Sequence, residues 1–308
     1  MSTILYSHSA CLQHETGSFH PESPDRLRAV LAALEREEFS YLERREAPKA
    51  TVEQLSRSHA ASYVLGLLRA IPAEGVRQID ADTVVSPGSG EAALRAAGAV
   101  VAAVDAVMAG EARNAFCAVR PPGHHAEPGS AMGFCLFNNV GVGAYHARKV
   151  HGLKRIAIVD FDVHHGNGSE TLAKADPDLF YASTHQAPLY PGTGMDNDPA
   201  HPNVVNAYLP PGAGSAEFRA DMERNVLPVL DRFAPEFVFI SAGFDAHRDD
   251  PLAEMNLVEA DYSWATEKLM DVAAKHCTGR VVSTLEGGYD LDALGRSAAA
   301  HVRSLMSH

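Results

Sequence analysis

The chain contains 308 residues, of which 46% are hydrophobic and 21% are charged, and its formal net charge at pH 7 is −13. This composition predicts a sizeable buried core, and the excess of acidic residues excludes a protein that binds the nucleic-acid backbone directly. No apolar run reaches membrane-spanning length, and residues 1–6 show neither the basic region nor the long apolar core of a secretory signal. We therefore expect a cytoplasmic protein without a membrane partner. No linker, charge block or repeat divides the chain, which predicts one domain over residues 1–308.

Apolar runs and helical patterns alternate along the chain. Helical spacing of apolar residues predicts helices over 92–108, 217–233, 259–274 and 291–305. Strands are predicted over 114–119, 155–159, 179–183, 204–209 and 280–286, and within 236–245. Because parallel strands need crossover connections, this alternation indicates an α/β domain with a parallel sheet and helices on both of its faces.

The cysteines are scattered along the chain. The four of them, Cys11, Cys117, Cys135 and Cys277, show no CxxC spacing, so neither a disulfide framework nor a thiolate zinc site is expected. We expect all four to be reduced. Cys135 lies close to the site motifs described below, and we interpret it as a small buried hydrophobe rather than a nucleophile.

Three side chains that can bind a metal follow the apolar run 155–159. They are Asp160, Asp162 and His164, at every second position, and in an extended strand such residues share one face. Buried carboxylates are costly unless they are paired, hydrogen-bonded or bound to a cation. The pattern therefore indicates a metal site, although by itself it fits an N-cap and turn cluster beside a strand equally well.

Other predicted strands also end in polar or glycine-rich motifs. The run within 236–245 ends at Asp245, strand 114–119 leads to His124 and His125, and strand 280–286 leads to Gly287-Gly288-Tyr289. Ligands of an open parallel sheet gather outside the carboxyl ends of its strands. We therefore predict that these strand ends meet at one pocket.

The donor types suggest a catalytic metal. Two carboxylates and one imidazole leave coordination positions open for a water molecule and a substrate oxygen. We expect Zn²⁺ first, and Fe²⁺, Co²⁺ or Mn²⁺ suits the same donors because no thiolate selects against them.

The paired histidines can supply proton transfer beside such a metal. Asp160 and Asn167 offer a carboxylate and a neutral acceptor that could orient the rings of His124 and His125. The Tyr289 hydroxyl could stabilise a developing oxyanion. The alternatives are two loop histidines exposed to water and a turn with a core tyrosine.

Seven blocks of sequence, in their order along the chain, closely resemble the zinc-dependent histone deacetylases and acetylpolyamine amidohydrolases, in particular the class II-like bacterial members. They are residues 20–26, 120–125, 133–139, 160–168, 190–194, 241–245 and 286–289. The resemblance covers nearly the whole chain. It implies an arginase/deacetylase-type α/β fold, with a central eight-stranded parallel sheet flanked by helices.

The resemblance also implies roles for single residues. Asp162, His164 and Asp245 would bind zinc, His124 would pair with Asp160, and His125 would pair with Asn167. His125 would carry most of the proton transfer to and from a metal-activated water, His124 would act as its electrostatic partner, and Tyr289 would hold the oxyanion. Asn167 is the class II form, since class I relatives carry aspartate there. Backbone oxygens of a second set would bind K⁺: Asp160, Asp162, His164, Ser183 and Thr184.

Substrate contacts are implied in the same way. Phe134, Tyr190 and Leu252 would line a narrow channel, Asp82 would grip a substrate backbone amide at its rim, and Arg26 would lie beneath the site. The remaining expected substrate contacts are glycines: Gly133, Gly287 and Gly288.

We thus expect hydrolysis of an acylated lysine peptide or protein, or of another small acylated amine. The alternatives are an acetylpolyamine amidohydrolase and, in another class, an acyl-amine sensor or scaffold without turnover. A manganese ureohydrolase would need a fuller set of ligands for two metals. A homo-oligomer remains open, and so does the natural acyl chain.

Overall fold

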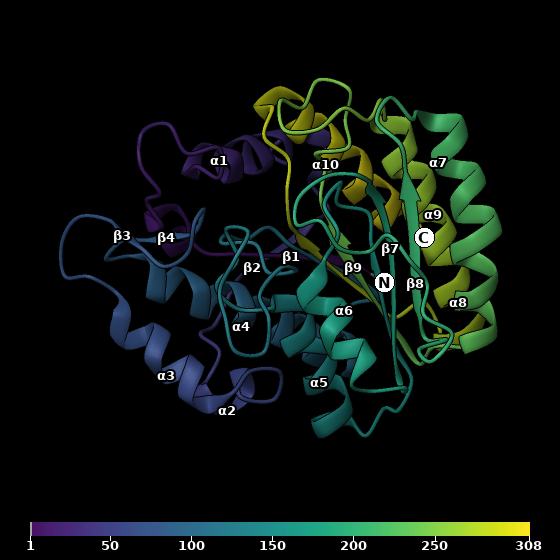
Figure 1. The fold of residues 1–308 in the computed structure, drawn as a ribbon. Helices are drawn as coiled ribbons and strands as arrows, with labels where there is room; N and C mark the ends of the chain where they lie inside the picture. The colour runs from purple at the N-terminus through teal and green to yellow at the C-terminus, as the bar shows by residue number, and fades with distance from the viewer. Residues whose placement is uncertain (1) are drawn as a thin grey trace.

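An eight-stranded parallel sheet forms the centre of the computed structural model, which describes residues 2–308 (Figure 1). Its strand order is β2-β1-β5-β10-β9-β6-β7-β8. The strands are β1 Thr3–Ser7, β2 Glu43–Glu46, β5 Asn114–Cys117, β6 Ile156–Asp160, β7 Leu179–Gln186, β8 Val204–Leu209, β9 Phe237–Ala242 and β10 Val281–Leu285. A separate antiparallel pair, β3 Arg77–Gln78 and β4 Val84–Val85, lies outside this sheet.

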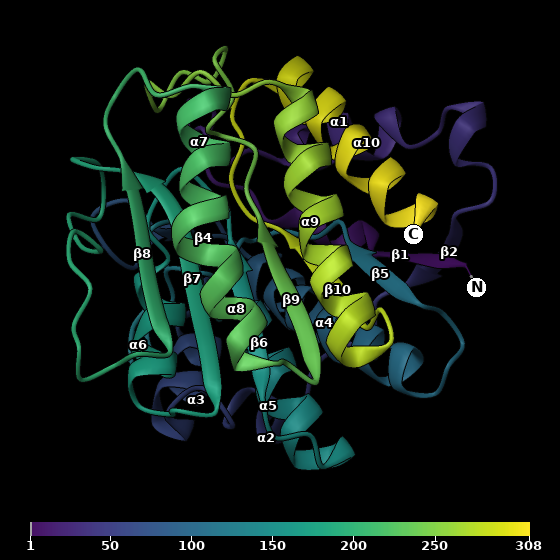
Figure 2. The ribbon, with the colours of Figure 1, turned by 90° about the vertical axis from the view of Figure 1, so that its right-hand side faces the viewer.

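Helices cover both faces of the sheet, as alternating strands and crossovers require. Figure 2 shows α7, α8, α9 and α10 over one face, and Figure 1 shows α4, α5 and α6 on the other side. The helices are α1 Pro24–Ala33, α2 Val52–Leu55, α3 Ala61–Ala70, α4 Ser89–Met108, α5 Asn139–His151, α6 Asn167–Lys174, α7 Ser215–Asp221, α8 Leu227–Phe233, α9 Glu259–Cys277 and α10 Leu291–Ser307. Two 3-10 turns, η1 Ser9–Gln13 and η2 Glu37–Phe39, complete the N-terminal part.

The predicted eight-stranded parallel sheet is confirmed, and each of the four predicted helical segments contains helix. The segment 217–233 differs from its prediction, because a π-helical turn, η3 Met222–Val226, separates α7 from α8. The edge strand β2 has no apolar run, since three of its four residues are exposed. Its pairing with β1, rather than its own pattern, makes it a strand.

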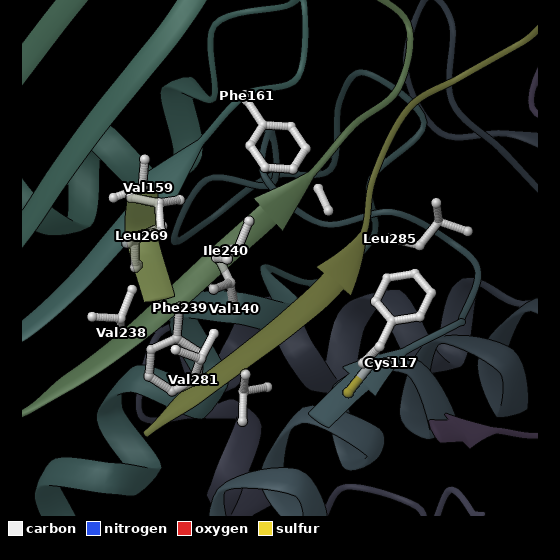
Figure 3. Packing of buried hydrophobic residues seen from close by; sticks show 14 of the residues in the cluster. Cys117, Val140, Val159, Phe161, Val238, Phe239, Ile240, Leu269, Val281 and Leu285 are labelled. Carbon is white, nitrogen blue, oxygen red and sulfur yellow. The ribbon is translucent and has the colours of Figure 1, made fainter. Parts of the chain in front are cut away.

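The core lies between the central strands and the helices on either side. Figure 3 shows Val238 and Ile240 of β9 and Val281 of β10, with Leu269 from α9 and Val140 from α5 close by. All of these residues are at most 1% exposed, and the four cysteines are free and buried. Within residues 2–308, no helix combines the length and apolar character that crossing a bilayer needs. The buried central strands place their carboxyl ends, and the loops that follow, at one edge of the molecule.

Candidate active site

Two neighbouring strands bring together three side chains that could hold a metal ion. Asp162 and His164 lie in the loop after β6, and Asp245 lies in the loop after the adjacent β9. The Nδ1 atom of His164 lies 3.1 Å from Asp162 Oδ1 and 3.1 Å from Asp245 Oδ2. The strand itself ends at Asp160, so Asp162 and His164 are placed by turns, in which each backbone N–H bonds the aspartate two residues earlier. Asp160 lies outside this group of three, and its carboxylate contacts His124 instead.

This group has the properties of a metal site. The donor atoms of Asp162, His164 and Asp245 all lie within 4.8 Å of one another, and all three residues are buried. Burial alone would lower the pKa of His164, but the two aspartates outweigh it and raise that pKa to about 10. Their carboxylates thus attract positive charge to this point. A metal cation bound by the same atoms would supply it, and it would keep coordination positions open for a water molecule and a substrate.

The backbone at Gly287 lies very close to the two aspartates of this group. The Gly287 N–H donates to Asp162 Oδ2 at 2.7 Å. A Cβ atom at this glycine would lie only 2.0 Å from Asp245 Oδ2. The residue at position 287 must therefore be glycine for the carboxylates to hold their positions.

His124 and His125 are adjacent and buried, with ring centroids 4.0 Å apart. His124 Nδ1 lies 2.9 Å from Asp160 Oδ2, and His125 Nδ1 lies 2.8 Å from Asn167 Oδ1. The structure thus forms both pairs that the sequence suggested. Tyr181 also donates to Asp160 Oδ2, at 3.2 Å, so this carboxylate is held from two sides.

The surroundings give the two rings opposite protonation states. Burial would lower the pKa of His124, but Asp162 and Asp160 outweigh it and raise this pKa to about 10. For His125, burial and then the positive charges of His124 and His164 hold the pKa well below its ordinary value. At neutral pH His124 is therefore a cation and His125 a neutral ring that can accept a proton.

Glu286 fixes the loop that carries both histidines, and sequence reasoning gave it no role. Its carboxylate is fully buried and accepts the N–H groups of Gly123 at 2.7 Å and His124 at 3.1 Å. The Ser241 hydroxyl donates to its other oxygen at 3.2 Å. The available signal was a carboxylate that ends an apolar strand directly before two glycines.

A cavity of about 240 Å³ leads to these groups. Its lining contains the predicted channel residues and the reactive side chains: Asp82, His125, Gly133, Phe134, His164, Leu189, Tyr190, Leu252 and Tyr289. Leu189 is an addition, because the sequence pattern indicates only that it belongs to a loop. Gly287 and Gly288 are absent from this lining and lie among the buried residues behind it. A larger cavity of about 690 Å³ follows the edge strand β8 and shares none of these residues.

Asp82 shapes the channel wall. Its Oδ1 accepts the Gly133 N–H at 3.0 Å, while the Thr83 hydroxyl accepts the Phe134 N–H at 3.1 Å. Gly133 and Phe134 both have positive φ, 56° and 67°, a conformation that these contacts help to maintain. A Cβ at Gly133 would lie 2.4 Å from the His125 ring. One oxygen of the predicted rim carboxylate is thus already bonded within the protein.

Tyr289 is positioned by its backbone and by a buried arginine. Its N–H donates to Asp250 Oδ2 at 2.7 Å, and the Arg26 guanidinium lies 4.8 Å from the centre of its ring. Burial raises the pKa of Tyr289 well above its ordinary value, so its hydroxyl stays a hydrogen-bond donor. Arg26 is completely buried and donates to the Gly288 carbonyl at 2.6 Å, which places it beneath the site as expected.

Two further groups bear on cation binding. Ser183 pairs with Asp160 across β6 and β7, and the buried Thr184 hydroxyl has no hydrogen-bond partner within residues 2–308.

Elsewhere, Asp105 Oδ1 lies 2.7 Å from the Nε2 atoms of both His146 and His151. Arg57 donates to His146 Nδ1 at 2.8 Å, which leaves the ring proton on Nε2. This second group is therefore a hydrogen-bonded network rather than a set of free metal ligands.

Comparison with known proteins agrees with this geometry. The family described as "Histone deacetylase domain" matches residues 20–305. Histone deacetylase 14, chloroplastic, of Arabidopsis thaliana is 40% identical over 98% of this chain and 76% of its own length. The histone deacetylase-like amidohydrolase of Pseudomonas aeruginosa is 38% identical over 90% of this chain and 74% of its own. A crystal structure of the HDA15 HD domain superimposes with a TM-score of 0.91 at 34% identity, covering 100% of this chain and 89% of that one.

Proposed function

Because this chain belongs to the histone deacetylase family, we propose that it is a zinc-dependent amidohydrolase that removes acetyl or other short acyl groups from lysine side chains or related amines. One observation carries this proposal: the group that could hold a metal, the His125 ring and the Tyr289 side chain all lie at one cavity. Each of these groups has a defined role in amide hydrolysis.

The metal would be held by Asp162, His164 and Asp245, and Fe²⁺, Co²⁺ or Mn²⁺ suits the same oxygen and nitrogen donors. When bound, Zn²⁺ polarises a water molecule and the acyl carbonyl and so lowers the barrier to attack. A slim acyl-amine chain suits the channel, since Phe134, Tyr190 and Leu252 offer mainly apolar walls.

The protein's own groups then move the proton. His125 has its Nδ1 bonded to Asn167, so its Nε2 is available to take a proton from the attacking water. The water oxygen bonds to the carbonyl carbon, and the Tyr289 hydroxyl donates to the developing oxyanion. His125 returns the proton to the amine nitrogen as the C–N bond breaks, which yields a carboxylic acid and an amine. The remaining proton of the acid passes to the amine, and the products are a carboxylate and an ammonium ion. The cationic His124 stabilises the negative charge of this step.

We also propose that K⁺ binds to backbone oxygens of residues 160, 162, 164, 183 and 184. The support is the pairing of Asp160 with Ser183 and the unpartnered Thr184 hydroxyl, which has no hydrogen bond within residues 2–308. A monovalent cation there would offset the mutual repulsion of the buried carboxylates nearby.

The test is turnover of a fluorogenic acetyl-lysine peptide by the zinc-loaded protein, with N8-acetylspermidine as a parallel substrate. We expect hydrolysis of the peptide at the higher kcat/KM. A clear preference for acetylspermidine would instead favour an acetylpolyamine amidohydrolase. Zinc binding with turnover of neither substrate would contradict the proposal and favour a sensor or scaffold.

A further inference from the structure

The Asn167 amide lies between the His125 ring and a carboxylate that has no assigned role. Its Oδ1 is 2.8 Å from His125 Nδ1, and its Nδ2 is 2.6 Å from Glu127 Oε1. Two more acceptors surround the same nitrogen, Met132 Sδ at 3.3 Å and the His125 carbonyl at 3.4 Å. Asn167 is 7% exposed, so water has little access to its amide.

This arrangement fixes the direction of the amide. A carboxylate can only accept hydrogen bonds, so the NH₂ of Asn167 must face Glu127. The carbonyl oxygen of the amide must then face His125, and an oxygen can only accept. His125 therefore carries its proton on Nδ1, and its Nε2 keeps the free lone pair. Without the carboxylate, a reversed amide could donate to Nδ1 and place the proton on Nε2.

We propose that Glu127 is a positioning residue that sets the tautomer of His125 through Asn167. This inference rests on the proposed function, in which Nε2 of His125 accepts a proton. The Nδ1 atom of His124 faces a carboxylate directly, that of Asp160, at 2.9 Å. The Nδ1 atom of His125 faces the Asn167 amide instead, and the Glu127 carboxylate lies beyond that amide. The amide orients the ring, while the negative charge stays further from it. The two neighbouring rings thus have different acceptors at Nδ1, a carboxylate for His124 and an amide oxygen for His125.

Glu127 is itself held firmly in place. Its N–H donates to the Ser130 carbonyl at 3.0 Å, and its own carbonyl lies 3.0 Å from His59 Nδ1. His59 is buried, and its other ring nitrogen accepts the Asn138 N–H at 2.8 Å. The Nδ1 atom of His59 must then carry the ring proton and donate to the Glu127 carbonyl.

The test combines two substitutions that change charge at nearly constant volume. Glu127→Gln can face Asn167 with either end of its amide, so it permits the wrong tautomer and should lower kcat about tenfold, part of the usual contribution of a general base. Asn167→Asp places two carboxylates at hydrogen-bond distance, where both cannot stay ionised, and should lower kcat further. The double variant Glu127→Gln/Asn167→Asp removes this repulsion and restores an acceptor for His125. Its kcat should exceed that of Asn167→Asp but stay below the wild-type value at neutral pH, because the new carboxylate contacts His125 directly and raises the pKa of the ring.

The Glu127→Gln change should therefore lower activity when Asn167 is intact and raise it in the Asn167→Asp background, with KM and thermal stability nearly constant. Glu53→Gln, on the exposed surface of α2, is the matched control and should leave kcat unchanged. An unchanged kcat in Glu127→Gln, or the same fold-loss in both backgrounds, overturns the inference.

If the wild type hydrolyses no acylated amine, the proposed function fails. Imidazole ¹⁵N shifts then decide the inference: they should show His125 protonated on Nδ1 in the wild type and a mixture in Glu127→Gln.

Discussion

Two buried groups of charged residues lie close beneath the channel, and they are balanced in different ways. In the first group, Glu22 accepts hydrogen bonds from Arg26 at 2.9 Å and from Arg120 at 2.5 and 2.6 Å. All three residues are completely buried. Burial alone would raise the pKa of Glu22, but the two guanidinium groups outweigh it and lower this pKa to about 2.

The second group, Asp162, His164 and Asp245, has imidazoles in place of the guanidinium groups. Within residues 2–308, the ion pairs of these aspartates involve only His124 and His164. Burial and the neighbouring charge of Asp162 raise the pKa of Asp245 above its ordinary value. Buried carboxylates are costly unless a positive charge lies beside them, and in this second group only protonated imidazoles or a bound cation can supply it. The comparison separates an ion cluster closed by two arginines from a group of donor atoms that could hold a metal ion.

The largest expected effect comes from removing one donor side chain of the second group. Asp245→Ala and His164→Ala should each abolish amide hydrolysis, because two protein ligands hold zinc too weakly. The metal-free fold should survive, since Asp245→Ala also removes a repulsion. Initial rates with the acetyl-lysine peptide and far-UV circular dichroism check both statements. Full activity in either variant would remove that residue from the metal site.

A substitution in the first group, that of Glu22 and the two arginines, should change the free energy of unfolding. Glu22→Gln leaves two buried guanidinium groups unpaired and should destabilise the fold by about 3–5 kcal/mol at pH 7. A carboxyl whose folded-state pKa lies below its ordinary value stabilises the fold above that ordinary value, and this contribution is lost as the pH falls through the folded-state pKa. The stability gap between wild type and variant should therefore narrow as pH falls from the ordinary value of 4.5 toward 2.

Urea unfolding at pH 7 and pH 3 measures this gap. A gap that stays constant or widens at pH 3 would show that Glu22 is not stabilised by the two arginines. The variant should still bind zinc, which distinguishes it from Asp245→Ala.

Tyr289→Phe tests a residue that contacts Arg26 of the first group and lines the same cavity as His164 of the second. Loss of one oxyanion donor usually lowers kcat about a hundred- to a thousandfold. We expect that loss together with an unchanged zinc content, because the hydroxyl is not a metal ligand. Steady-state kinetics and metal analysis on one preparation suffice, and a wild-type kcat would exclude Tyr289 from the mechanism.

The smallest effect concerns substrate choice at the channel wall. Leu252 offers only apolar contact to a substrate, so acetyl-lysine should be preferred over N8-acetylspermidine. Leu252→Glu adds a partly screened attraction for an internal ammonium and should shift the ratio of kcat/KM toward the polyamine by up to about tenfold. If the ratio does not move, Leu252 is not the selector, and the acidic rim around Asp82 becomes the better candidate.

The parts of the site that could be predicted follow buried strands. β6, β9 and β10 are apolar runs, so the polar residues at their ends stood out in the sequence. Glu127 and Glu286 could not be assigned, because their partners are fixed by how loops meet in space. Asp82 illustrates the same limit, since it bonds Gly133, 51 positions away. β2 escaped detection because an exposed edge strand has no apolar pattern of its own.

Zinc content per chain tests the central claim most directly. Wild-type protein, Asp245→Ala and Asp105→Asn would be loaded with Zn²⁺, desalted and measured by mass spectrometry of the metal. Asp105→Asn is the control, because it alters another aspartate that contacts two histidines. We predict about one zinc ion per chain in the wild type and in Asp105→Asn, and nearly none in Asp245→Ala. Zinc retained by Asp245→Ala, or lost from Asp105→Asn instead, would contradict the account.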